Sequence, residues 1–310
     1  MPVKIQFLAR SGQFDVYRPH LEAALTEAGV AAELGTDFAP GEVDYLVYAP
    51  HGGALDFTPY VKAKAVLGLW AGVESIITNP TLTMPYARMV DHGLTEGMVE
   101  FVVGHVLRHH LGMDQDICRT EARWQVHVPP LARNRRVGVL GLGALGSACA
   151  QALAGLNFDV AGWSRRAKEL PGVACFAGDE GLRDVLARSE ILVLLLPATP
   201  ATENVLNAKT LALLPKGAAV VNPGRGALIE DAALLAALEA GQVGHATLDT
   251  FRVEPLPEDH PYWTHPRVTV TPHIASETRP ETAAQVIAEN IRRGEAGEGF
   301  LHLVDKAAGY

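Results

Sequence analysis

The glycine-rich segment Gly141–Gly146 is the feature that most constrains the fold of this chain. The apolar run Val137–Leu140 precedes it and predicts a buried strand, and the alanine- and leucine-rich run Ser147–Leu156 follows it and predicts a helix. In the pattern Gly-x-Gly-x-x-Gly, the first glycine permits a tight turn, the second lets a pyrophosphate approach the backbone, and the third lets helix and strand pack closely. A second predicted strand, Phe158–Trp163, completes a dinucleotide-binding unit with the anion at the helix N-terminus.

The residues after this second strand bear on which dinucleotide is bound. Enzymes that use NAD place an acidic residue about 20 residues past the glycine motif, where it hydrogen-bonds the ribose. Here Ser164, Arg165 and Arg166 stand at that position. A hydroxyl beside two guanidinium groups suits a 2′-phosphate, which predicts NADPH as the preferred cofactor and NAD as the alternative. The competing interpretation is a solvated basic turn.

Short apolar runs alternate with helical patterns along most of the chain. Runs at Val3–Ala9, Tyr45–Tyr48 and Ala65–Leu69 predict strands, and Leu21–Ala28 predicts a helix that ends at Gly29. Strands separated by helices pair in parallel through crossover connections. The pattern therefore predicts the α/β class, with doubly wound, mostly parallel sheets.

The middle of the chain is helical in pattern, which suggests a division into two domains. Glu96–Leu111 predicts a long helix and Asp114–Trp124 a second one, after which the α/β alternation resumes. A last predicted helix, Glu281–Arg293, packs back on the first domain. The predicted domains are a substrate domain of residues 1–96 plus 281–310 and a nucleotide-binding domain of residues 97–280.

Composition and charge exclude several classes of protein. With 48% hydrophobic and 20% charged residues, the 310-residue chain buries a full core and is not disordered. The net charge of −9 argues against a nucleic-acid-binding groove. The 3 cysteines stand far apart, which suggests neither a disulfide framework nor a thiolate metal site. The apolar runs are too short for a membrane span and no signal peptide is visible, so we expect a soluble, cytoplasmic protein.

Three further predicted strands are each followed by charged residues. These are Ala218–Val221 with Arg225, Ala246–Leu248 with Asp249 and Glu254, and Val268–Thr271 with His273. Ligands of open parallel sheets bind outside the carboxyl ends of the strands, so these loops are expected to converge near the cofactor. Taken singly, each residue also fits a solvated turn, a surface acid or a helix cap. No histidine and carboxylate pair has metal-ligand spacing, and no metal is expected.

On these motifs the chain resembles the D-isomer-specific 2-hydroxyacid dehydrogenase family over nearly its whole length. The matching segments are Ala71-Gly72-Val73-Glu74-Ser75, the glycine-rich turn, Trp163-Ser164-Arg165, Leu195-Leu196-Pro197, Asn222-x-x-Arg225-Gly226, Glu254-Pro255-Leu256-Pro257, Thr271-Pro272-His273 and Gly309-Tyr310. The resemblance implies two Rossmann-like domains, the first flavodoxin-like, with the active site in the cleft between them, and a homodimer. One departure is Pro223-Gly224, where the family more often has Leu-Ala or Ser-Ala, so the backbone there has to fit for Arg225 to keep its place.

The resemblance also implies a reaction and the residues that perform it. The reaction is NADPH-dependent reduction of a small 2-oxo acid, such as glyoxylate or hydroxypyruvate, to the 2-hydroxy acid. His273 would be the acid–base residue, Glu254 would orient its imidazole, and Arg225 would bind the substrate carboxylate. The alternatives are a dehydrogenase for another D-2-hydroxy acid, such as a phosphorylated one, a dehydrogenase for formate, and a non-catalytic relative that senses the nicotinamide redox state.

The remaining predicted contacts belong to substrate and cofactor. Backbone N–H groups of Ala71 and Gly72 would bind the substrate carboxylate, and Trp70 either narrows the substrate pocket or belongs to the core. The predicted cofactor contacts are Gly141, Leu142, Gly143, Ala144, Leu145, Gly146, Ser164, Arg165, Arg166, Leu196, Pro197, Thr202, Pro223, Gly224, Asp249 and Ser276. The family places Asp249 near the nicotinamide carboxamide.

Overall fold

The computed structural model describes residues 2–51, 55–122 and 124–306. The chain forms two compact units, unit 1 made of Met1–Leu94 and Glu277–Tyr310, and unit 2 made of Thr95–Ser276. The predicted boundaries, 96 and 281, lie two and four residues from these limits. The first boundary falls inside the helix α2 (His92–Leu111), where the sequence pattern is continuous and marks no break.

Unit 1 contains a parallel sheet of five strands in the order β2-β1-β3-β4-β5. The strands are β1 (Val3–Leu8), β2 (Ala32–Gly35), β3 (Tyr45–Tyr48), β4 (Ala65–Gly68) and β5 (Tyr86–Ala87). This order is the flavodoxin-like one, in which the chain winds to either side of its first strand. The fold predicted for this part of the chain is therefore confirmed.

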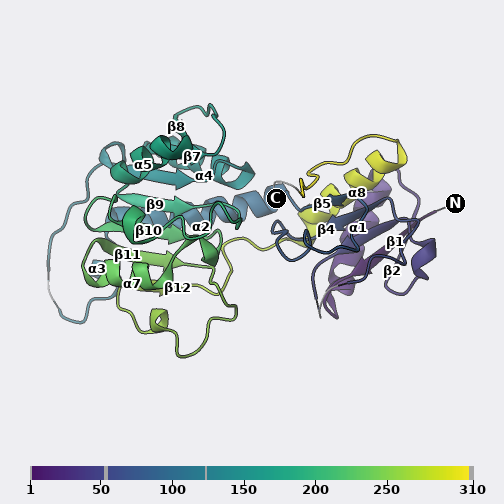
Figure 1. The fold of residues 1–310 in the computed structure, drawn as a ribbon, viewed down its shortest axis with the longest axis horizontal. Coiled ribbons are helices and arrows are strands. Elements are labelled where there is room, and N and C mark those ends of the chain that lie inside the picture. Colours follow the sequence, from purple (N-terminus) through teal and green to yellow (C-terminus); the bar gives the residue numbers. More distant parts are fainter. Residues whose placement is uncertain (1, 52–54, 123, 307–310) are drawn as a thin grey trace. The chain divides into compact units, whose positions relative to one another are not determined.

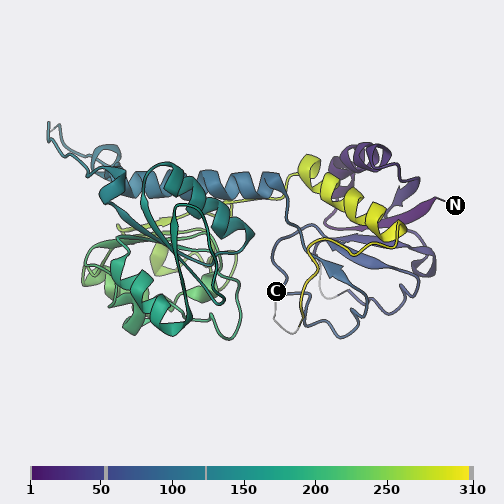
Figure 2. The same cartoon turned by 90° about the horizontal axis from the view of Figure 1, so that it is seen from above.

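One face of the unit 1 sheet is covered by α1 (Gln13–Glu27) and α8 (Pro280–Glu295), which come from opposite ends of the sequence. Leu21 of α1 and Ile287 of α8 are buried in the same apolar cluster as the central strands, and Figure 2 shows α8 in yellow beside α1 in purple. The other face is covered by side chains of connecting segments such as Phe57. Helix α1 begins eight residues before its predicted start and contains Pro19, a residue that usually ends helices.

Unit 2 contains a parallel sheet of seven strands in the order β12-β11-β10-β9-β6-β7-β8 (Figure 1). The strands are β6 (Arg136–Leu140), β7 (Asp159–Ser164), β8 (Val173–Ala177), β9 (Ile191–Leu194), β10 (Ala218–Asn222), β11 (Val243–Leu248) and β12 (Val268–Val270). From β6 the chain first builds outward through β7 and β8, then returns to β9 and builds the other way. The order thus reverses between β6 and β9, where doubly wound sheets bind their ligands.

Helices cover both faces of this sheet and create two apolar cores. Helices α2 and α4 (Ala144–Gly155) pack on one face, and α5 (Gly178–Arg188), α6 (Ala208–Leu211) and α7 (Asp231–Glu239) pack on the other. Figure 2 shows α2, in blue, along its side of the sheet. Short 3₁₀ helices lie at Pro40–Glu42, Ala132–Asn134, Gly226–Leu228 and Pro261–Trp263. Among the described residues, no helix combines the length and the apolar character that crossing a membrane requires.

The helix predicted over Asp114–Trp124 is wrong in its extent. The structure has the single turn α3 (Asp114–Ile117) there, and the described residues that follow, 118–122 and 124, are not in a helix or strand. Ile117 is 72% exposed and Trp124 is 96% exposed. With neither apolar side chain buried against the unit, a longer helix here would gain no packing energy to offset its ordering.

Candidate active site

The glycine-rich turn joins β6 to α4, and its three glycines have different reasons to be glycine. Gly141 has φ of +104°, and a Cβ there would lie 2.5 Å from the carbonyl oxygen of Leu195. A Cβ on Gly146 would lie 1.7 Å from the carbonyl oxygen of Gly141. At Gly143, by contrast, a Cβ would meet no atom within 4 Å. The fold needs the first and third glycines, whereas the second leaves open space before the N-terminus of α4, which fits the pyrophosphate of a dinucleotide.

The loop after β7 is basic and folds against this turn. The Ser164 hydroxyl donates a hydrogen bond of 2.7 Å to the carbonyl of Arg166, which closes a tight turn, and the side chains of Arg165 and Arg166 are exposed. Lys168, two residues further on, donates from its ammonium group to the carbonyl of Leu142 in the glycine-rich turn. The sequence pattern gives no signal for this lysine. No acidic residue occurs from Ser164 to Lys168, so the residue that usually hydrogen-bonds a ribose 2′-hydroxyl is missing there.

The turn after β10 is closed by the buried side chain of Asn222. Its amide nitrogen donates to the carbonyl of Arg225 at 2.9 Å, and its amide oxygen accepts from the N–H of Gly224 at 3.2 Å. A Cβ on Gly224 would lie 2.7 Å from the carbonyl oxygen of Leu194, so a glycine fits this position closely. The unusual pair Pro223-Gly224 therefore belongs to a well-bonded turn, and Arg225 is held half-buried with one Nη on the Gly224 carbonyl at 2.8 Å.

Asp249, directly after β11, holds the loop that carries His273. Its side chain is fully buried and accepts from the Thr271 hydroxyl at 2.6 Å and from the N–H groups of Ile274 and Ala275, each at 2.9 Å. The N–H of His273 donates to the Asp249 carbonyl at 2.9 Å. A carboxylate with this set of donors is a positioning residue for the loop. The predicted contact of Asp249 with the cofactor stays a prediction.

His273 and Glu254 form a close pair after β12 and β11. The Nδ1 atom of His273 lies 2.7 Å from one carboxylate oxygen of Glu254, and the other oxygen accepts from the N–H of Phe251 at 2.8 Å. His273 has φ of +55°, a conformation that few residues other than glycine adopt. The imidazole is 52% exposed and the carboxylate side chain 35% exposed. With Nδ1–H fixed on a carboxylate, Nε2 is the atom that can gain and lose a proton toward a ligand.

The loop after β9 contributes less polar chemistry. Leu196 is buried, and the Thr202 hydroxyl donates to the Pro197 carbonyl at 2.6 Å, so this hydroxyl closes the loop. Ser276, at the C-terminal limit of unit 2, is half-buried. The cofactor contacts of Leu196, Pro197, Thr202 and Ser276 stay predictions.

The predicted substrate residues of unit 1 directly follow β4. Trp70 is 38% exposed and its carbonyl accepts from the N–H of Met89 at 2.9 Å, so the interpretation of Trp70 as a core residue is wrong. Ala71 and Gly72 are half-buried, and their contacts with substrate stay predictions. The matching C-terminal pair Gly309-Tyr310 lies outside the described residues.

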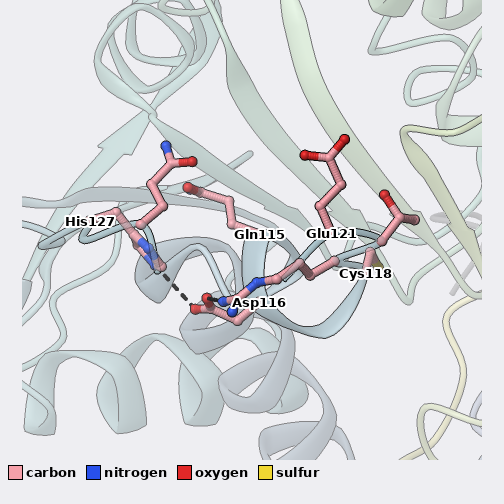
Figure 3. Close-up of a pocket in the computed structure, with 8 residues that line it drawn as sticks. Gln115, Asp116, Cys118, Glu121 and His127 are labelled. Atoms are coloured by element: carbon pink, nitrogen blue, oxygen red, sulfur yellow. Dashed lines mark hydrogen bonds and ion pairs between the residues drawn. The ribbon is translucent and has the colours of Figure 1, made fainter. Parts of the chain in front are cut away.

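Two surface pockets lie away from all predicted site residues. Figure 3 shows the first, of about 240 Å³, in which His127 lies 3.5 Å from the carboxylate of Asp116. The second, of about 500 Å³, lies in unit 1 beside Phe57 and Tyr60. Across the described part of the chain, no three His, Cys, Asp or Glu side chains are arranged to hold a metal ion. Neither pocket contains the pair of His273 and Glu254, so the loops at the carboxyl ends of the unit 2 strands remain the candidate site.

Comparisons with known proteins point to one family. A sequence model described as "D-isomer specific 2-hydroxyacid dehydrogenase, NAD binding domain" matches residues 102–275, which is nearly all of unit 2. The chain is 39% identical over 312 residues to a glyoxylate/hydroxypyruvate reductase A of Yersinia enterocolitica, with 95% of this chain and 98% of the relative covered.

Solved structures agree with the sequence comparisons. A D-isomer specific 2-hydroxyacid dehydrogenase from Xanthobacter autotrophicus Py2, crystallised with NADPH and MES, is 41% identical with a TM-score of 0.92, covering 100% of this chain and 99% of that one. An NADPH-dependent glyoxylate/hydroxypyruvate reductase from Sinorhizobium meliloti, crystallised with NADP and sulfate, is 33% identical with a TM-score of 0.85, at 100% and 99% coverage. Both likenesses extend over the whole of this chain.

Proposed function

The chain belongs to the D-isomer-specific 2-hydroxyacid dehydrogenase family, and from this membership we propose that it reduces glyoxylate and hydroxypyruvate to the corresponding 2-hydroxy acids with NADPH. The relatives named as glyoxylate/hydroxypyruvate reductases support this substrate class. The relatives crystallised with NADPH or NADP support this cofactor.

The observation that carries the proposal is the pair of His273 and Glu254, with 2.7 Å between Nδ1 and the carboxylate. An imidazole oriented by a carboxylate is a general acid whose proton-bearing atom points away from its partner. Asp249 fixes the backbone of the same loop through its three side-chain hydrogen bonds. A histidine that only faced solvent would need neither the contact with Glu254 nor a loop held by Asp249.

His273 would stabilise the charge that develops during the reduction. When bound, NADPH supplies a hydride to the carbonyl carbon of the substrate, and negative charge grows on the carbonyl oxygen. A protonated His273 donates a hydrogen bond from Nε2 to that oxygen and then transfers its proton to it. Glu254 orients the ring, because its carboxylate lies in hydrogen-bond contact with Nδ1 and leaves Nε2 toward the substrate. The product leaves as the 2-hydroxy acid, and His273 regains a proton from solvent.

Arg225 would bind the carboxylate of the substrate. A guanidinium group donates two parallel hydrogen bonds to a carboxylate, which orients the acid as well as attracting it. The Asn222 bonds hold the backbone of Arg225, so the guanidinium starts from a fixed base. Further donors to the carboxylate would be the N–H groups of Ala71 and Gly72, with Trp70 limiting the size of the acid.

The cofactor would bind at the reversal of strand order in unit 2. The open space at Gly143 accepts the pyrophosphate, and the Ser164, Arg165 and Arg166 side chains meet the 2′-phosphate. Charge-assisted hydrogen bonds contribute about 1.5–3 kcal/mol each before solvent screening. Because the two arginines are exposed, we expect a net preference for NADPH over NADH of about 10–100-fold in kcat/KM.

A panel of 2-oxo acids, each with NADPH and with NADH, tests the proposal by absorbance of the reduced nicotinamide. We expect glyoxylate and hydroxypyruvate to give the highest kcat/KM, with NADPH preferred. Preference for a different acid would replace the proposed substrates, and equal use of both cofactors would mean that the basic turn faces solvent. If NADPH binds but no acid on the panel is reduced, the protein is a nicotinamide sensor instead of an enzyme.

We also propose that the protein is a cytoplasmic homodimer. Five large apolar side chains of one segment in unit 2 are more than half exposed in the single chain, namely Ile117, Trp124, Val126, Val128 and Leu131. A group of this kind on a protein surface usually marks an interface. The three cysteines are free thiols, as expected in a reducing compartment. Sedimentation equilibrium of the wild-type protein and of the Trp124→Ser variant measures the mass in solution, and a monomeric wild type refutes the dimer.

A further inference from the structure

Lys168 connects the basic loop after β7 to the glycine-rich turn. Its ammonium group donates to the carbonyl of Leu142, which is the second residue of the Gly-x-Gly-x-x-Gly pattern. The two segments that this contact joins are those that meet the phosphate groups of a dinucleotide in this type of fold. The lysine side chain therefore lies between the loop expected to contact the ribose and the turn expected to contact the pyrophosphate.

We propose that Lys168 is a specificity-determining residue that binds the 2′-phosphate of NADP together with the arginines of the same loop. This inference rests on the proposed function, because it assumes that NADPH is the cofactor. It adds a cation that neither the sequence pattern nor the comparisons assign.

The chemistry of the ammonium group supports this role. It has three N–H donors, and the hydrogen bond to Leu142 uses one of them. The carbonyl is a neutral acceptor, so it fixes the position of the ammonium group without neutralising its charge. A phosphate that arrives beside it meets a full positive charge and two further donors. An anchored lysine also loses less side-chain entropy on binding than a freely moving one.

The arrangement of the loop supports it as well. The hydrogen bond from Ser164 to the Arg166 carbonyl turns the chain, so that Arg165 and Arg166 are exposed at the tip and Lys168 comes back to the glycine-rich turn. Three positive charges thus lie within four residues, and the next acidic residue, Glu169, is exposed. A phosphate with close to two negative charges is better matched by three cations than by the two arginines alone.

Isothermal titration of the full-length protein with adenosine 2′,5′-bisphosphate and with adenosine 5′-monophosphate isolates the 2′-phosphate without requiring turnover. We expect Lys168→Gln to raise the Kd of the bisphosphate on the order of tenfold while changing the Kd of the monophosphate by less than about twofold. Lys168→Arg keeps the charge and should restore most of the affinity for the bisphosphate. Lys216→Gln removes the same charge from the opposite end of the strands, just before β10, and should change neither Kd.

Two outcomes would overturn the inference. If Lys168→Gln raises the Kd of both ligands equally, the lysine stabilises the turn or binds the part that the two nucleotides share. If it raises neither Kd, the ammonium group only donates to the Leu142 carbonyl. Thermal unfolding of the variant without ligand separates a folding defect from a binding defect. The wild-type ratio of the two Kd values tests the proposed cofactor, and the change of that ratio in the variant tests Lys168, so the two failures are distinguishable.

Discussion

The three glycines of the turn between β6 and α4 should respond differently to the same small change, and Gly143→Ala is the informative variant. The structure leaves open space for a Cβ at Gly143, with no atom within 4 Å. Its backbone, with φ of −71° and ψ of −164°, is one that alanine adopts without strain. We therefore expect Gly143→Ala to fold normally and yet to bind NADPH poorly, because the added methyl group occupies the space that the pyrophosphate requires.

The magnitudes follow from the contacts. For Gly143→Ala, a gain of about 0.4–1 kcal/mol from a stiffer unfolded chain and a similar loss at the N-cap of α4 nearly cancel. A methyl group that displaces the phosphate removes at least one charge-assisted hydrogen bond, about 1.5–3 kcal/mol, or roughly 10–150-fold in Kd. In Gly146→Ala, by contrast, the Cβ would lie 1.7 Å from the Gly141 carbonyl oxygen. Strand and helix would have to separate there, at a cost of about 3 kcal/mol or more.

Urea unfolding without ligand and fluorescence titration with NADPH measure the two effects separately. The expected result is a Gly143→Ala protein with wild-type stability and weak NADPH binding, next to a Gly146→Ala protein of much lower stability. Gly143→Ala binding NADPH within twofold of the wild type would refute the placement of the pyrophosphate. A loss of stability equal to that of Gly146→Ala would show that the open space is needed by the fold.

Four further predictions concern acid–base chemistry, substrate binding, cofactor choice and pH. His273→Ala should lower kcat by about 10²–10⁴ while leaving the Kd of NADPH nearly unchanged, and near-normal kcat would remove His273 from the mechanism. Arg225→Lys keeps the charge but loses the planar fork, so KM for glyoxylate should rise strongly; unchanged kinetics would make Arg225 structural. Replacing Arg165 and Arg166 with glutamine should erase most of the NADPH preference through KM, and a retained preference would place the selectivity elsewhere. Burial, with smaller effects from neighbouring cationic groups, lowers the pKa of His109 to about 3. On acidification the imidazole is protonated in the unfolded chain before it is protonated in the folded one. The free energy of unfolding should therefore fall as the pH drops from about 6.5 toward 3, by up to about 1.4 kcal/mol per pH unit. His109→Gln should flatten this dependence between pH 7 and pH 5, and an unchanged slope would contradict the burial argument.

The sequence predicts those parts of the structure whose signal is local. Residues that are adjacent in the sequence determine where a strand, a glycine-rich turn and a helix form. The structure has all three as predicted, at β6, the turn and α4. The strand β8 and the helix α5 were not predicted individually. Two of the five residues of β8 are alanine, which is depleted in strands, and the strand lies at the sheet edge, where it is only partly buried. The segment after α3 shows the opposite error, since its apolar residues suggested a helix but are exposed to solvent.

The candidate site divides in the same way. That charged residues follow β10, β11 and β12 is visible in the sequence, and the structure brings Glu254 and His273 into contact. The positioning of the His273 loop by Asp249 could not be read from the sequence, because the hydrogen-bond partners of Asp249 lie 22 to 26 residues further along the chain. Lys168 was missed for a similar reason, since its partner Leu142 precedes it by 26 residues. Contacts of this kind depend on the conformation of loops, and the hydrophobic pattern of the sequence does not predict loop conformation.

The split of unit 1 between the two ends of the sequence has a consequence for synthesis on the ribosome. Helix α8 buries Ile287 and Ile291 in the same core as Leu21 and Leu25 of α1. At about 5–20 residues per second, the roughly 180 residues of unit 2 take on the order of 10–40 seconds to translate before α8 appears. Unit 2 is continuous and has all its strands by then, whereas the sheet of unit 1 waits with one apolar face covered by α1 alone. During that interval the nascent chain offers chaperones a target that the finished protein no longer has.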